Sequence, residues 1–127
     1  MADRAASLSR NTLGLIRIVN GALGLFAPRV LIGRIDDRQP PSPAAVYAFR
    51  LFGVRTILIG RDLLALRGDA LDRAVAAAPL IHASDTVTAA VLTATGQVDR
   101  RRGALLTGIS ALNTALAVLA LRPVRRG

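Results

Sequence analysis

The chain has no cysteine and no tryptophan, only 3% of its residues are aromatic, and it contains a single histidine. Without cysteine there is no disulfide, no thiolate nucleophile and no Cys-ligated metal. A single histidine excludes a multi-histidine metal site. Stacking of nucleic-acid bases needs aromatic side chains, and the chain has too few of them to form such a platform. We therefore expect no metal, no cofactor and no catalytic residue, and we predict that the protein is not an enzyme.

Lysine and glutamate are also absent, because all 17 basic residues are arginine and all 8 acidic residues are aspartate. This bias is typical of a GC-rich genome and carries little mechanistic information. The net charge of +9 favours an anionic partner, which is either a nucleic acid or a lipid surface. Neither a P-loop nor a GxGxxG motif occurs, so nothing indicates nucleotide binding.

Aliphatic residues are what the chain has in excess. Its 127 residues are 52% hydrophobic, whereas soluble domains are about 45–50% apolar. A soluble domain of this length normally has a larger share of polar residues for its surface. The length allows one domain, so we predict a single membrane-embedded helical domain over residues 1–127.

Breaker residues divide the chain into four apolar segments. Pro28 ends the first segment, and Ser9 or Asn11 is a candidate cap for its start. The QPPSP stretch at residues 39–43 is the strongest breaker, with Ser42 as the expected N-cap of the next helix. The composition and these signals predict an all-α fold, a four-helix transmembrane bundle, with helices at about residues 12–27, 43–66, 70–95 and 102–121.

The last segment gives the strongest indication of a membrane span. Residues 103–121 contain no charged side chain, and their number is close to the roughly 20 apolar residues that a spanning helix needs. Arginines flank this segment on both sides, as in membrane topology signals; they are Arg100, Arg101, Arg102, Arg122, Arg125 and Arg126. The segment at 43–66 is marginal by itself because of its charges, but it is acceptable inside a bundle.

The first apolar segment does not match a cleaved signal peptide, because Arg17 and Asn20 interrupt it and no small-residue cleavage site follows. Residues 29–37 alternate apolar and charged side chains, which is typical of a segment along a membrane interface.

Charged residues within the second and third segments are the candidate site. His82 and Asp85 are three residues apart and share one helix face. The simplest partner for Asp85 is Arg55, near the middle of the preceding helix. Such a pair has three interpretations: a structural lock, a proton relay or polar ligand site, or an active site. The predicted ligand-binding or buried polar network comprises Arg50, Arg55, Arg61, Asp62, His82 and Asp85.

Small residues at helical spacing are the predicted packing surfaces. Gly53 and Gly60 lie on one face of the second helix, where packing explains them better than phosphate contact. A similar stripe follows the last helix; it comprises Ala104, Gly108, Ala111 and Ala115.

The spacing Arg50-x-x-Gly53-x-Arg55, followed by Gly60-Arg61-Asp62, comes after a first helix that ends at a proline. With Asp85 in the third helix, this pattern resembles a group of uncharacterised small four-helix bacterial integral membrane proteins that carry domain-of-unknown-function labels. The resemblance implies a fold and no activity.

Three classes of function remain open from the sequence. We expect a multi-pass protein of the plasma membrane, in contact with the lipid bilayer and with both termini in the cytoplasm. In the first class it is a structural or interaction subunit that forms a homo-oligomer or joins a larger membrane complex. In the second it binds or carries a small polar or lipid ligand at an Arg/His/Asp site. The third is a soluble basic protein that binds nucleic acid, which the arginines flanking apolar segments disfavour.

Overall fold

The structure, a computed structural model, describes residues 1–121. These residues form five helices and no strand, which confirms the predicted all-α class for this part of the chain. The arginines expected beyond the last helix, at 122, 125 and 126, lie outside the described residues. In chain order the helices are α1 (Ala2–Phe26), α2 (Pro28–Ile32), α3 (Pro43–Ala65), α4 (Gly68–Ala94) and α5 (Arg100–Leu119).

Capping residues explain where two of the long helices begin. The Ser42 hydroxyl accepts a hydrogen bond from the backbone N–H of Ala45 at 3.1 Å, as expected of an N-cap before Pro43. The Asp99 carboxylate accepts bonds from the backbone N–H groups of Arg101 and Arg102. Helix α5 therefore begins two residues earlier than the sequence pattern predicted.

The first two helices differ from the prediction. Helix α1 begins at Ala2 rather than near residue 12, because the alanine-rich lead favours a helix, and Ser9 is buried within it instead of capping it. The segment expected along the interface begins with a short helix, α2, whose first residue is Pro28.

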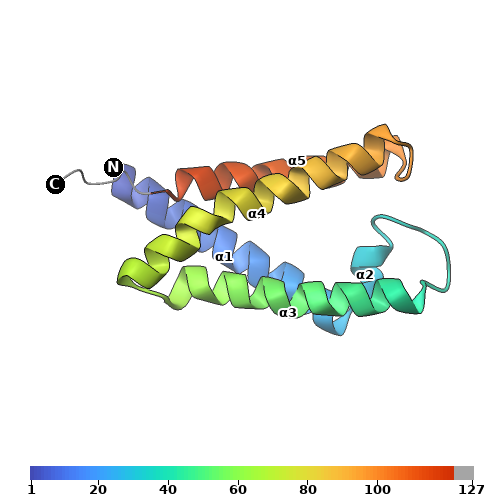
Figure 1. Cartoon of the computed structure of the whole chain (residues 1–127), viewed down its shortest axis with the longest axis horizontal. Helices are drawn as coiled ribbons and strands as arrows, with labels where there is room; N and C mark the ends of the chain where they lie inside the picture. Colours follow the sequence, from blue (N-terminus) through green and yellow to red (C-terminus); the bar gives the residue numbers. More distant parts are fainter. Residues whose placement is uncertain (122–127) are drawn as a thin grey trace.

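The long helices are arranged as two pairs, α1 with α3 and α4 with α5 (Figure 1). The pairs meet at the end where α3 turns into α4, and they diverge toward the end that holds α2 (Figure 1). A four-helix bundle is therefore not confirmed. The hydrophobic core comprises Leu13, Leu63, Leu71, Val75, Ala78, Ala117 and Ala120.

Glycines bring α1 and α3 into backbone contact. A Cβ atom on Gly21 would lie 2.7 Å from the Gly53 carbonyl oxygen, and one on Gly60 would lie 2.6 Å from the Gly14 carbonyl oxygen. The pairing of Gly14 with Gly60 and of Gly21 with Gly53 makes the two helices antiparallel. Such close approach is typical of helices that associate in a lipid environment.

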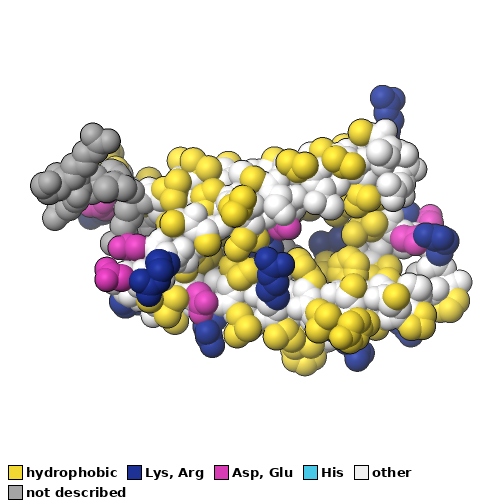
Figure 2. All heavy atoms as spheres, viewed as in Figure 1, with side chains coloured by type: hydrophobic (Ala, Val, Ile, Leu, Met, Phe, Trp, Pro, Cys, Tyr) yellow, Lys and Arg dark blue, Asp and Glu magenta, His cyan; other side chains and the backbone are white. Residues whose placement is uncertain are grey.

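Many large apolar side chains are exposed, although the core is itself mostly apolar. Apolar side chains are spread over the face drawn in Figure 2, and Leu15 and Val19 of α1 are among the exposed ones. Several polar side chains are buried: Ser9, Arg17, Thr56, His82 and Asn113. Exposed apolar side chains in such number suit a surface that contacts protein or lipid.

Three of the described helices, α3, α4 and α5, are long and apolar enough to cross a membrane. This is consistent with a multi-pass membrane protein. Helix α1 is not among the three, and Arg10, Arg17 and Asn20 interrupt its apolar residues. The prediction of four apolar spans is therefore confirmed for three helices only.

We predict that Gly53→Ala separates α1 from α3. Its Cβ atom would clash with the backbone nitrogen of Leu25 and lie 2.6 Å from the carbonyl oxygen of Gly21, and these backbone atoms cannot rotate away. Overpacking costs about 1–3 kcal/mol, and we expect a loss at the upper end of that range. The measurement is thermal unfolding in detergent, followed by circular dichroism.

The matched control is Gly108→Ala, because a Cβ atom there has no neighbour within 4 Å. Alanine in place of a mid-helix glycine stabilises a helix by about 0.5–1 kcal/mol. Equal stability of the two variants would contradict the close α1–α3 contact.

Candidate functional site

Helix α1 carries Arg17 into the interior of the protein. Arg17 lies on the same helix face as Gly14, Gly21 and Gly24, which pack against α3. Only 4% of its surface is exposed. A guanidinium keeps its charge at any physiological pH, so one buried this deeply requires a partner.

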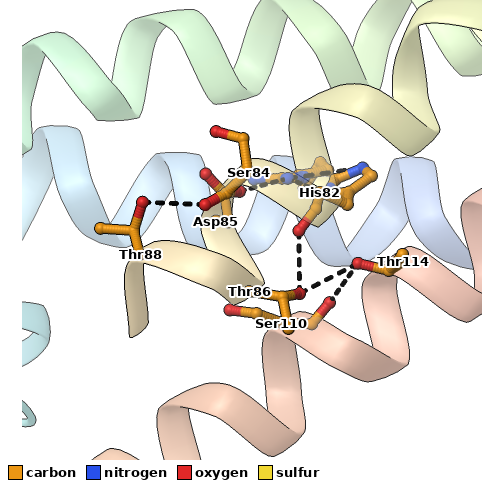
Figure 3. Close-up of polar contacts among 8 residues, drawn as sticks. His82, Ser84, Asp85, Thr86, Thr88, Ser110 and Thr114 are labelled. Atoms are coloured by element: carbon orange, nitrogen blue, oxygen red, sulfur yellow. Dashed lines mark hydrogen bonds and ion pairs between the residues drawn. The ribbon is translucent and has the colours of Figure 1, made fainter. Parts of the chain in front are cut away.

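Helix α4 supplies the partners of Arg17, which are His82 and Asp85; the side chains of these two residues lie close together in Figure 3. The Nη2 of Arg17 donates a hydrogen bond to Oδ2 of Asp85 at 3.0 Å and also contacts Nδ1 of His82. The His82 ring is fully buried. A guanidinium can only donate, so the ring nitrogen of His82 that accepts from Arg17 carries no proton.

A chain of hydroxyl groups extends this cluster to α5 (Figure 3). Thr86 Oγ1 lies 2.9 Å from the carbonyl oxygen of His82 and 3.0 Å from Thr114 Oγ1. Thr114 Oγ1 in turn lies 3.0 Å from the carbonyl oxygen of Ser110. Two hydroxyl protons serve these three contacts, so only two of them are hydrogen bonds at one time.

A cavity of about 400 Å³ adjoins the cluster. Its size is within the roughly 300–1,000 Å³ that ligand pockets occupy. Side chains from all five helices contribute to its wall. The polar ones are Arg17, Asn20, Arg34, Asp85, Thr88, Ser110 and Asn113, and the large apolar ones are Leu31, Ile35, Phe49, Phe52, Leu92, Leu106 and Ile109.

Two side chains of the cavity wall have unsatisfied polar atoms. Nε of Arg17 and Oδ1 of Asn113 are buried without a hydrogen-bond partner among the described residues. Each such atom typically costs about 1–3 kcal/mol. Residues 1–121 leave these two atoms without a partner, and water or a ligand in the adjoining cavity could supply the hydrogen bonds.

The structure brings together only part of the predicted polar network. His82 and Asp85 lie in the cluster, but Asp85 pairs with Arg17 in place of Arg55, which corrects the expected pairing. Arg55 and Arg50 are exposed and have no ion pair within residues 1–121. The two remaining predicted residues form a neighbouring surface pair at 2.8 Å, Arg61 with Asp62.

The sequence analysis missed Arg17 and Asn113 as site residues. A signal for Arg17 was present, because it follows Gly14 by three residues and precedes Gly21 by four, which places it on the glycine face. No comparable signal marks Asn113, which is a polar residue in an otherwise apolar helix.

The predicted packing residues occupy two different environments. Gly53 and Gly60 lie in the α1–α3 contact. The small residues of α5 face outward, and several of them line a groove with Ala90 and Thr93 of α4. These outward residues are Ala104, Gly108, Ala111 and Ala115.

The cluster offers charge and hydrogen bonds rather than an activated nucleophile. Within residues 1–121 the His82 ring has hydrogen-bond contacts only with the Arg17 guanidinium, so no serine or threonine hydroxyl is positioned for deprotonation by it. The same part of the chain contains no group of three potential metal-ligating side chains.

We predict that Arg17→Met destabilises the protein by about 1.5–3 kcal/mol, because it removes the charge-assisted hydrogen bond from Arg17 to Asp85. The double variant with Asp85→Asn should be no less stable than Arg17→Met alone, because the Asp85 side chain is 43% exposed and its charge is solvated. Arg55→Met is the matched control, an exposed arginine without an ion pair within residues 1–121, and should change stability by no more than about 0.5 kcal/mol. Unfolding in detergent measures all three, and a larger effect of Arg55→Met would contradict the assignment of the pair.

The chain matches no family model, no curated protein and no solved structure. The geometry of the structure is therefore the basis for proposing a function.

Proposed function

We propose that this is a multi-pass membrane protein that binds or carries a small ligand in the cavity between its two helix pairs. The observation that carries this proposal is the cavity of about 400 Å³ beside Arg17 and Asn113. Both side chains are more than nine-tenths buried, and each has an unsatisfied polar atom. Polar groups that converge on a largely apolar cavity are typical of ligand sites.

Helix α1 spans the membrane together with the three more apolar helices in this proposal. Its glycines contact α3 from Gly14 opposite Gly60 to Gly24 opposite Gly53, so the two helices occupy the same depth. At about 1.5 Å per residue, the 25 residues of α1 are long enough to cross the hydrocarbon core. Its one central charge, Arg17, is neutralised by Asp85.

The arginines of α3 are the main cost of a membrane location. Arg61 is offset by Asp62, and arginines near helix ends can extend toward the interface. Arg55 is close to the middle of α3, and it lies near enough to Arg17 for their like charges to repel. We propose that Arg55 faces the polar gap between the helix pairs rather than lipid.

Four spans place both termini on one side of the membrane. A slight excess of flanking arginines favours the cytoplasm for that side, and the proposed location is the plasma membrane.

A second candidate function is that of a structural or interaction subunit. Its support is the outward stripe of small residues on α5, which includes Gly108 and Ala111 and borders a groove along α4. Such a stripe suits close contact with a helix of another chain, either in a homo-oligomer or in a larger membrane complex.

We predict that the full-length protein stays with the membrane pellet in alkaline carbonate and is released only by detergent. The physical reason is the apolar exterior, which α3, α4 and α5 would expose to lipid. Membrane fractionation followed by immunoblotting makes the measurement. A protein found in the soluble fraction would contradict the proposal and make nucleic acid the leading partner, with an affinity that falls steeply as salt is raised.

We predict that small amphiphiles bind saturably in the cavity. Phe52→Trp would provide a single fluorescent reporter in its wall, because the protein has no tryptophan of its own. The probes are 8-bromooctanoate, 8-bromooctanol and 8-bromooctylammonium, whose bromine quenches tryptophan on contact. In nanodiscs of zwitterionic lipid, at least one probe should quench the reporter to a plateau.

The matched control is Tyr47→Trp, an exposed aromatic position on the same helix that is not part of the cavity wall. Quenching there should rise in proportion to the probe in the bilayer and show no plateau. If no probe gives saturable quenching at position 52, the ligand-binding function is wrong.

A further inference from the structure

We infer that the ligand of this cavity is an amphiphile with one anionic group. This rests on the proposed ligand-binding function and adds to it the chemical class of the ligand. The cavity wall contains two guanidinium groups, those of Arg17 and Arg34, but only one carboxylate, that of Asp85. Residues 1–121 therefore leave one positive charge of the wall without a counterion.

The single carboxylate is already engaged. Asp85 accepts its hydrogen bond from Arg17 at 3.0 Å, and Arg17 is also close enough to Arg55 to be repelled by it. Arg34 forms no ion pair with any residue in 1–121. An anion in the cavity would therefore meet an excess of positive charge.

The acidic residues that follow Arg34 in the sequence have partners of their own. Asp36 pairs with Arg38 at 2.8 Å, and Asp37 pairs with Arg102 at 3.2 Å. The hydrogen bonds from Arg38 hold the pKa of the Asp36 carboxyl below its usual range. In the structure neither carboxylate is paired with Arg34.

The remainder of the wall suits a hydrocarbon chain. Phe49 and Phe52 of α3 lie edge to face, with ring centres 6.1 Å apart, and both belong to the cavity wall with Leu31 and Leu106. The volume of about 400 Å³ is more than twice that of the roughly 150 Å³ apolar cavity that holds benzene. A free inorganic anion would leave this apolar surface uncovered.

A neutral or cationic amphiphile would fill the same volume but would not balance the positive charge of the cavity wall. A cation would add a second positive charge beside the guanidinium of Arg34, and the two like charges would repel each other. A neutral alcohol would leave the guanidinium without a counterion. An anionic head group provides both charge balance and hydrogen-bond acceptors for arginine.

The test uses the full-length Phe52→Trp protein in zwitterionic nanodiscs. We expect 8-bromooctanoate to quench with a dissociation constant at least tenfold lower than those of 8-bromooctanol and 8-bromooctylammonium. Bromoacetate, which has the charge without the chain, should bind at least tenfold more weakly than 8-bromooctanoate. Equal binding of the three long probes, or a preference for the alcohol or the ammonium compound, would overturn the anion assignment while leaving the ligand-binding function intact.

Two further variants of the Phe52→Trp protein test whether Arg34 is the residue that binds the anionic group. Arg34→Gln should weaken the binding of 8-bromooctanoate at least fivefold and leave that of 8-bromooctanol unchanged. Arg29→Gln is the matched control, an exposed arginine of α2 outside the cavity wall, and should have no effect. Equal effects of the two variants would mean that general surface charge attracts the anion, and would overturn the role of Arg34.

Nanodiscs that contain phosphatidylglycerol distinguish two sources of the anionic amphiphile. If a membrane lipid is the natural ligand, this lipid should displace 8-bromooctanoate from the reporter. If the natural ligand is a soluble carboxylate, quenching by 8-bromooctanoate should persist. Absence of saturable quenching by any probe, with the protein folded by circular dichroism, would instead overturn the ligand-binding function and this inference together.

Discussion

The ion pair between Arg17 and Asp85 is the interaction on which the arrangement of this protein depends. A lone guanidinium among aliphatic helices would be very costly, so α1 can occupy the interior only because α4 supplies a carboxylate and an imidazole at the same depth. The pair thereby joins one helix pair to the other. Both of its side chains also belong to the cavity wall, so the same contact that holds the two pairs together forms part of the candidate site.

Close packing within the first pair explains the unusual outside of the molecule. Because Gly21 and Gly53 bring the backbones of α1 and α3 into contact, little bulky apolar surface is needed between them. Many large aliphatic side chains are exposed instead, such as Leu15 and Val19 of α1. In water, exposed aliphatic side chains contribute nothing to the stability that comes from burying apolar surface. In a lipid bilayer, helices associate instead through close packing and buried polar contacts. The interior and the exterior thus point to the same environment.

The sequence predicted what depends on local chemistry and missed what depends on the arrangement of helices. Ser42 and Pro43 predict the start of a helix from the local sequence alone, and the structure confirms this start. The partner of Asp85 could not be found in this way. Arg55 was favoured because its helix precedes that of Asp85, yet α3 and α4 make few contacts with each other after their turn. Arg17 is much farther away in sequence, and only its position among the α1 glycines indicated that it faces inward.

Charge placement connects the fold to its candidate ligand. Arg17 is deep and has its counterion, while Arg34 is exposed and lacks one among the described residues. An uncompensated charge is tolerable only where water reaches it, which is the situation of Arg34 and not of Arg17. The proposed anionic amphiphile would replace part of that water with its head group, and its hydrocarbon chain would cover Phe49 and Phe52.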